Sequence, residues 1–195
     1  GMLLGMVSAV RRNTIYDNVA TTLAVLGRAV PNFWLSIMLI VLFGATLRWL
    51  PPSGYGTAAH IVMPAFALSA GLAAMVARLT RSSLLEVMRH DFVRTARAKG
   101  LPENAVLNRH VLRNALIPIT TVVGLQAGHL LGGAIITETI FAWPGIGRLL
   151  IQSISNRDLI VVRNCVMLLA TMVVLVNFVV DVLYAAIDPR VKAQA

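Results

Sequence analysis

Long uncharged stretches alternate along the chain with short segments rich in arginine. Four of these stretches contain no charged residue at all: residues 29–47, 61–77, 114–137 and 164–180. A helix needs about 17–25 residues to cross the hydrocarbon core of a bilayer, and each stretch reaches that length. The pattern therefore predicts four transmembrane helices in an all-α, polytopic transmembrane helical bundle.

The first ten residues form a shorter apolar stretch, which ends at Arg11 and Arg12. Ten residues are too few to cross a bilayer, and the stretch lacks the basic segment that opens a secretory signal. We interpret residues 1–10 as the end of a truncated helix. The chain is then predicted to be one partial transmembrane domain, residues 1–195, whose N-terminal helices are missing.

The composition agrees with a membrane protein. Hydrophobic residues make up 57% of the chain and charged residues 13%, whereas soluble domains average about 45–50% and about 25%. The formal net charge of +9 has two explanations, a nucleic-acid partner or the excess of lysine and arginine in cytoplasmic loops. The positions of the charges decide between them.

Thirteen of the 17 basic residues fall on one side of the predicted membrane. Four crossings place residues 11–28, 78–113 and 184–195 on that side. Residues 48–60 and 138–163, on the other side, hold the remaining four. The positive-inside rule makes the first group cytoplasmic. The basic residues therefore predict how the chain is oriented in the membrane, with lipid as its surroundings, and they give no reason to expect a nucleic-acid partner.

Proline and capping residues predict where two helices begin. Pro31 suits the first turn of the first complete span, because its missing N–H has no partner there in any case. Asp17 or Asn18 is expected to cap a short helix, residues 19–26, that lies at the inner membrane surface.

The longest cytoplasmic loop, residues 78–113, predicts a structured corner. A helix from about Asp91 to Lys99 would end with Gly100 in a left-handed conformation, and Pro102 suits the first turn of the next helix. Two helices joined by a tight, exposed corner are suited to docking a partner. An amphipathic connector lying on anionic lipid fits the same pattern.

Small and polar residues inside the third span are candidates for packing and transport. Gly124, Gly128 and Gly132 recur every four residues, a spacing that allows close helix contact. Gln126 and His129 lie on another side of the helix. They either face a translocation pathway or form an interhelical hydrogen bond.

Asn177 and Asp181 lie four residues apart in the last span. Their spacing puts both on one face of the helix, where they are expected to pair with a neighbouring helix near the inner surface. We favour a structural role over transport for this pair.

The chain lacks the patterns of a metal site or an enzyme. One cysteine, Cys165, excludes an internal disulfide framework and a Cys-based zinc site. The four histidines fall in different segments without paired ligand spacing: His60, His90, His110 and His129. No phosphate-binding glycine loop, zinc-protease motif or hydrolase nucleophile motif occurs. We expect no metal, cofactor or catalytic residue in this chain.

Two stretches of the cytoplasmic loop resemble a known family. Residues 94–101, Arg-Thr-Ala-Arg-Ala-Lys-Gly-Leu, and residues 109–118, Arg-His-Val-Leu-Arg-Asn-Ala-Leu-Ile-Pro, resemble the coupling loop of ABC transporter permeases of the dipeptide, oligopeptide and nickel importers. The similarity continues in residues 138–147, Glu-Thr-Ile-Phe-Ala-Trp-Pro-Gly-Ile-Gly. The wider importer signature has Glu-Ala-Ala at residues 94–96 and a closing proline at Arg113. The peptide and nickel branch commonly departs from it as this chain does.

The resemblance implies a function and a set of partners. Such a permease forms the translocation pathway of an ATP-driven importer for peptides or related small solutes, nickel included, in a bacterial or archaeal inner membrane. It pairs with a second homologous permease subunit, two cytoplasmic ATP-binding subunits that hold ATP and Mg²⁺, and an extracytoplasmic solute-binding protein. The ATPase-coupling residues implied are Arg94, Thr95, Ala96, Lys99, Gly100, Leu101, Arg109 and His110.

The resemblance also implies contacts at the outer mouth. The candidates for an outer gate or a docking surface are Glu138, Trp143, Gly145, Arg157 and Asp158, although a plain solvated loop fits the last two equally well. The alternatives from other classes are an ion-gradient-driven secondary transporter or channel, and an intramembrane enzyme. The absence of buried acid clusters counts against proton coupling, and the absence of a nucleophile and base counts against the enzyme.

Overall fold

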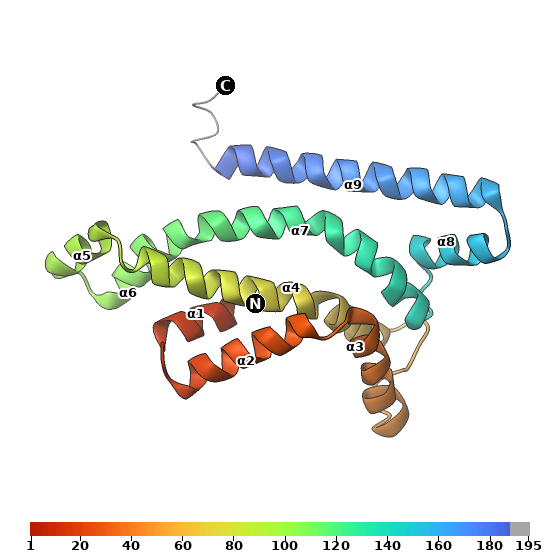
Figure 1. The fold of residues 1–195 in the computed structure, drawn as a ribbon, viewed down its shortest axis with the longest axis horizontal. Helices are drawn as coiled ribbons and strands as arrows, with labels where there is room; N and C mark the ends of the chain where they lie inside the picture. The colour runs from red at the N-terminus through yellow and green to blue at the C-terminus, as the bar shows by residue number, and fades with distance from the viewer. Residues whose placement is uncertain (188–195) are drawn as a thin grey trace. The chain divides into compact units, whose positions relative to one another are not determined.

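The computed structural model describes residues 1–187, except for the side chains at positions 117, 125, 127–129, 131, 133, 181 and 183–187. Every regular element in this part is helical. The α-helices and the two π-helical segments, η1 and η2, are, in chain order (Figure 1), α1 (Met2–Val10), α2 (Ile15–Ala29), α3 (Asn32–Leu39), η1 (Ile40–Thr46), α4 (Ala59–Val87), α5 (Asp91–Ala98), α6 (Glu103–Ala105), η2 (Val106–Leu112), α7 (Arg113–Ile140), α8 (Ile146–Ser155) and α9 (Leu159–Ile187).

Two helices in the described part are long and apolar enough to cross a membrane, namely Ala59–Val87 and Leu159–Val180. A third crossing is added if Ile15–Ala29 and Asn32–Thr46 form one interrupted span. The 28-residue α7 contains the predicted run 114–137. The fold is therefore all-helical, as predicted, and the number of complete spans stays a prediction.

The first predicted span differs from the observed helix. The uncharged run 29–47 predicts one helix with Pro31 in its first turn, but Pro31 is the extended residue before the helix, with φ −62° and ψ 138°. Its ring also disfavours a helical conformation at Val30. As a result α2 and α3 are separate helices. Seven residues of the run, Ile40–Thr46, adopt the wider π-helical conformation.

The chain divides into two compact units. The first comprises residues 1–28 and 72–124 with the end of α9 from Val182, and the second comprises residues 29–71 and 125–181. The first unit contains the basic segments that the charge pattern assigns to the cytoplasm. The second contains the segments assigned to the opposite side.

In the first unit, α1 packs closely on α4 through small residues. A Cβ on Gly5 would lie 2.4 Å from the carbonyl oxygen of Ala77, and a Cβ on Gly1 would lie 2.6 Å from that of Ala73. Ala9, four residues further along, is 3% exposed. Small residues at this spacing allow helices to approach within backbone contact, and sequence reasoning missed this stripe.

A buried carboxylate fixes α2 against α1 and α4. Asp17 is 3% exposed and accepts two hydrogen bonds from Arg81, at 2.7 and 2.9 Å. It also accepts hydrogen bonds from the Ser8 hydroxyl and the Asn13 N–H. The predicted cap of a helix over residues 19–26 is therefore wrong, because Asp17 lies inside the longer α2 and its charge is used in a tertiary ion pair.

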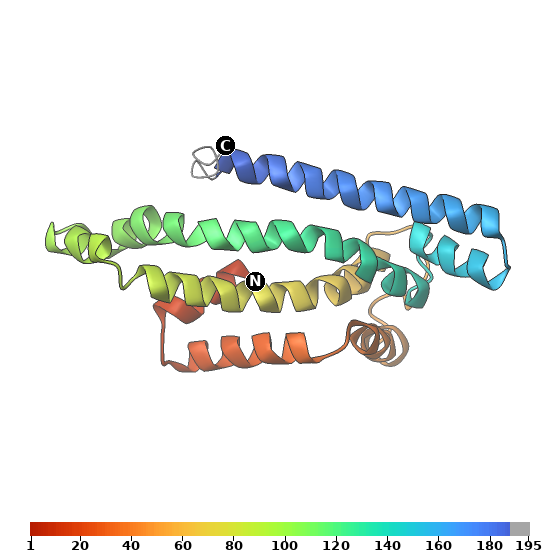
Figure 2. The same cartoon turned by 45° about the horizontal axis from the view of Figure 1, so that its top comes forward.

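The second unit has its own apolar core. Leu39, Met63, Ala67 and Phe141 are buried against one another. The short α8 folds back beside the end of α7 (Figure 2), and a Cβ on Gly147 would lie 2.6 Å from the Ile135 Cα. The close approach of these two helices positions residues 138–148, which are described below.

Candidate functional site

The predicted cytoplasmic corner forms where α5 ends. Gly100 has φ +77°, in the left-handed region that glycine adopts without steric cost. Its N–H donates to the Arg97 carbonyl at 2.9 Å, and the Leu101 N–H donates to the Ala96 carbonyl at 3.4 Å. These two bonds make a Schellman motif, and Pro102 then precedes α6 as its N-cap. The helix, the glycine turn and the start of a second helix agree with the sequence prediction, but Pro102 is the extended residue before that helix, with φ −63° and ψ 143°, and not a residue of its first turn.

The corner stands on a buried apolar base. Val93, Val106 and Val111 are completely buried, and they pack with residues from α1, α4 and α7. Because the base joins the end of α1 to both arms of the loop, the corner is held to the helices of the first unit. Such an anchor suits a segment that transmits force more than it suits a loose connector.

An ion pair bridges the two arms of the corner. Arg97, in the last turn of α5, donates from Nη2 to Glu103 Oε1 at 2.6 Å and from Nε to Oε2 at 3.1 Å. These hydrogen bonds lower the pKa of Glu103 and raise that of Arg97. Sequence reasoning missed this pair, although a base just before the glycine and an acid just after the proline are a usable signal.

The predicted coupling residues lie on both sides of this corner. Arg94, Thr95, Lys99 and Gly100 are exposed, and Leu101 is 41% exposed at the tip. Arg109 is exposed on η2, and His110 beside it is half-buried. Ala96 differs from the rest, because it is 4% exposed and belongs to the buried base. Its side chain therefore holds the corner together and does not present a contact to a partner.

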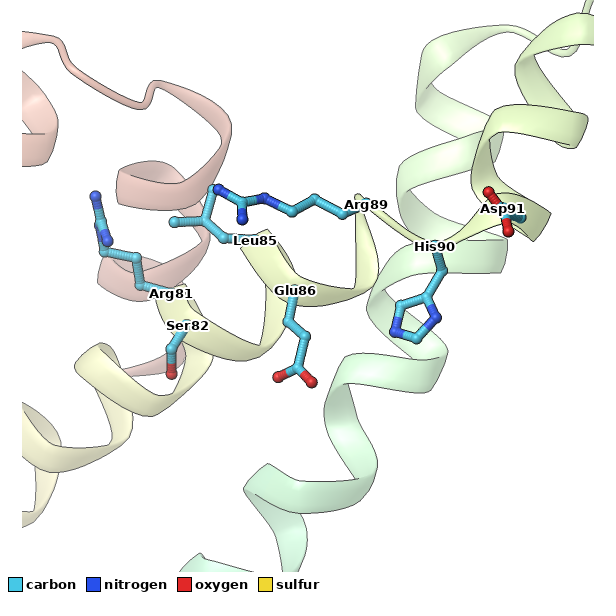
Figure 3. A pocket seen from close by; sticks show the side chains of 7 residues that line it. All are labelled: Arg81, Ser82, Leu85, Glu86, Arg89, His90 and Asp91. Atoms are coloured by element: carbon cyan, nitrogen blue, oxygen red, sulfur yellow. The ribbon is translucent and has the colours of Figure 1, made fainter.

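A charged cavity of about 590 Å³ lies along the end of α4, directly before α5. Figure 3 shows its lining, in which Arg81 and Arg89 extend to one side of α4 while Glu86 and His90 extend to the other. Arg81 is engaged by Asp17, whereas Arg89, Glu86 and His90 are exposed. Glu86, Arg89 and His90 lie at the end of α4 or directly after it, outside the turn at Gly100.

In the second unit, the side chain of Glu138, near the end of α7, contacts the segment that leads into α8. Its Oε2 accepts a hydrogen bond from the Arg148 N–H at 3.1 Å, at the positive end of α8. A Cβ on Gly145 would lie 2.1–2.3 Å from the Glu138 carboxyl group. The motif that resembles the permease family thus has an internal use, which is to hold α8 against α7. Trp143 is half-buried beside it.

Arg157 and Asp158 join α8 to α9. Arg157 has φ +58° and follows the C-cap residue of α8. Asp158 Oδ1 accepts hydrogen bonds from the N–H groups of Ile160 and Val161, at 3.2 and 3.1 Å, as an N-cap of α9 does. Arg157 thus ends α8 and Asp158 starts α9. The docking contacts predicted for both residues stay predictions.

The comparisons with known proteins decide the family. Residues 1–193 match the family described as binding-protein-dependent transport system inner membrane component. The chain belongs to this family. It is 44% identical, over its full length, to the di/tripeptide transport system permease protein DppB of Pseudomonas aeruginosa, and 47% identical over 98% of its length to the glutathione transport system permease protein GsiC of Pectobacterium atrosepticum.

This family member spans 66% and 63% of the length of those two relatives. Among solved structures, the MetNI methionine ABC transporter in an inward-facing conformation has a chain that matches with a TM-score of 0.72 at 21% identity. The match covers 96% of this chain and 85% of the other. At that identity the likeness supports the fold alone, and it agrees with the all-helical permease architecture.

The residues predicted to act inside the spans are less well defined than the corner. Gln126 is half-buried, and the burial of Gly128, His129 and Asp181 lies outside the described part. Gly132 has no atom within 4 Å of the position of a Cβ, and Asn177 is exposed. The predicted pathway and packing roles therefore stay predictions. Among the described residues, no group of three or more metal-ligating side chains is found.

Proposed function

We propose that this chain is part of a permease subunit of an ATP-driven importer for peptides or related small solutes. The observation that carries the proposal is the exposed Gly100 corner on a buried base, in a chain that belongs to the binding-protein-dependent transport family. The printed names of the relatives, di/tripeptide and glutathione permeases, favour peptide-like solutes. The subunit lies in the inner membrane as a multi-pass protein.

In the proposed mechanism this chain supplies the membrane pathway and the mechanical coupling, and no catalysis. A second permease subunit completes the pathway, an extracytoplasmic binding protein delivers the solute, and two cytoplasmic subunits bind and hydrolyse ATP with Mg²⁺. Arg94, Thr95, Lys99 and Leu101, around Gly100, contact the ATPase. Closure of the ATPases moves the corner, and the apolar base passes that movement to α1, α4 and α7, so that two arrangements of the helices alternate.

The test replaces Gly100 with valine in the full-length subunit, assembled with its partners in proteoliposomes. No atom lies within 4 Å of a Cβ at this position, so the substitution acts on the backbone conformation of the corner and not on packing. We expect solute uptake and solute-stimulated ATP hydrolysis both to fall at least tenfold. If both stay at the wild-type level, the proposed coupling role is refuted.

Gly56 provides a matched control. It too has a positive φ, +123°, and no atom within 4 Å of a Cβ, but it lies in the loop between η1 and α4. Gly56→Val therefore strains the backbone at least as much without touching the cytoplasmic corner. It is expected to leave the coupling between uptake and ATP hydrolysis intact. Uptake that continues without the ATPases would instead indicate an ion-driven transporter or a channel.

A further inference from the structure

Beyond the apolar base, where Val93 and Ala96 of α5 pack with Val106 of η2, the ion pair of Arg97 and Glu103 joins the two arms of the corner near the tip. The Arg97 guanidinium donates two hydrogen bonds to the Glu103 carboxylate, with N···O distances of 2.6 and 3.1 Å. Two bonds fix the relative orientation of the two side chains as well as their separation, because a planar guanidinium matches a carboxylate in few orientations. The pair spans the residues from Ala98 to Pro102 that form the tip.

Little else holds the tip in place. The buried base ends at Val93 and Ala96, while every residue from Arg97 to Glu103 is exposed to solvent or nearly so. One of the two backbone bonds of the turn is long, at 3.4 Å. The apolar base holds α5 against η2, and the ion pair adds a side-chain contact across the exposed turn between them.

The other basic residues near the tip, Arg94 and Lys99, lack a close ion pair with a described residue. Arg94 reaches Asp91 only at 3.7 Å, with both side chains more than three-quarters exposed. Lys99 forms no ion pair with a described residue. The charges of Arg94 and Lys99 are thus available to a partner surface, whereas the charge of Arg97 is balanced by Glu103 inside the corner.

We infer that Arg97 and Glu103 are positioning residues, which hold the tip of the corner in the shape that the ATPase receives and do not themselves bind it. This inference rests on the proposed function. Losing the pair should weaken docking, because the tip must then be ordered when the ATPase binds, and it should leave the rate of the fully docked complex unchanged. Ordering a free loop on binding lowers the affinity and not the chemistry.

The experiment titrates the ATPase subunits against full-length permease complex in nanodiscs and follows solute-stimulated ATP hydrolysis. Glu103→Gln keeps the side-chain shape and removes the charge. We expect it to raise the half-saturating ATPase concentration about two- to fivefold, the range for an exposed ion pair, with an unchanged maximal rate. The swap Arg97→Glu with Glu103→Arg should restore most of the affinity, since it rebuilds the pair with the charges exchanged.

Glu86→Gln is the matched control, because it removes the same charge from an exposed acid on α4, outside the tip. A Glu103→Gln effect equal to that of the control would overturn the inference. So would a swap that is no better than Arg97→Glu alone, since Arg97 would then be contacting the ATPase directly. Gly100→Val in the same titration separates the two proposals. If it uncouples hydrolysis while Glu103→Gln has no effect, only the positioning role fails, and if neither has an effect, the proposed function fails.

Discussion

The buried carboxylate of Asp17 offers the sharpest test of how the first unit is held together. Asp17→Asn keeps the volume of the side chain but turns an amide toward the Arg81 guanidinium, which had donated hydrogen bonds at 2.7 and 2.9 Å. Removing one partner of a fully buried pair costs about 3–5 kcal/mol. The Arg81 side chain is 30% exposed, so it regains some hydration, and we expect a loss of about 2–3 kcal/mol.

Thermal unfolding of the purified full-length subunit in detergent measures this loss. At about 2–4 °C per kcal/mol for a chain of this size, the expected fall in Tm is about 4–12 °C. Asp91→Asn is the control, since its pair with Arg94 is long and exposed, and it should leave the Tm within experimental scatter. The double variant Asp17→Leu, Arg81→Met should unfold at a higher temperature than Asp17→Asn, because it leaves no unpaired charge. A Tm for Asp17→Asn equal to that of the control would refute the reasoning.

Four further variants test the turns and the corner, each measured by thermal unfolding. Gly147→Ala should destabilise by about 2–3 kcal/mol, because its Cβ would meet the α7 backbone. Gly145→Ala should cost less, about 1–2 kcal/mol, since the flexible Glu138 carboxylate can move away at the expense of one hydrogen bond; the reverse order would contradict the packing. Arg157→Gly should raise stability by about 0.5–1 kcal/mol, because glycine adopts the observed φ of +58° without strain; an unchanged or lower Tm would count against it. The pKa of Glu103 lies below its ordinary value of 4.5. The ion pair's contribution to the free energy of unfolding is therefore complete above pH 4.5 and is lost as the pH falls through the lowered pKa. The Tm difference between wild type and Glu103→Gln should thus be constant from pH 6 to 8 and shrink in acid; a difference that instead grows would be incompatible with the ion pair.

Sequence reasoning succeeded where the signals are local. The corner is determined by residues 91–103, in which an acid, a glycine and a proline each fix one step of the backbone. The structure reproduces the helix from Asp91, the left-handed Gly100 and the restart after Pro102. No information from the rest of the chain was needed for these assignments.

Reasoning failed where the deciding partner is distant in sequence. Asp17 looks like a helix cap from its neighbours alone, and its use becomes visible only with Arg81, 64 residues later. The small residues at positions 1, 5 and 9 have the same four-residue spacing as those of the third span, but only packing against α4 shows that their stripe is in use. Spacing identifies a candidate face, and the neighbour that covers it comes from the tertiary fold.

The helix ends explain why the corner in particular could be predicted. Three helices end in the same pattern of two backbone bonds, with Gly100, Ala142 and Arg157 as the residue of positive φ. At Ala142 the conformation is reinforced by Arg148, which donates to its carbonyl oxygen, and at Arg157 by the capping of α9 through Asp158. Neighbouring contacts can hold a strained residue in this way, so no glycine is required. No atom lies within 4 Å of a Cβ on Gly100. The left-handed backbone conformation at position 100 therefore relies on glycine itself, while the Arg97–Glu103 pair acts on the residues to either side, and for that reason the sequence predicts this turn and not the other two.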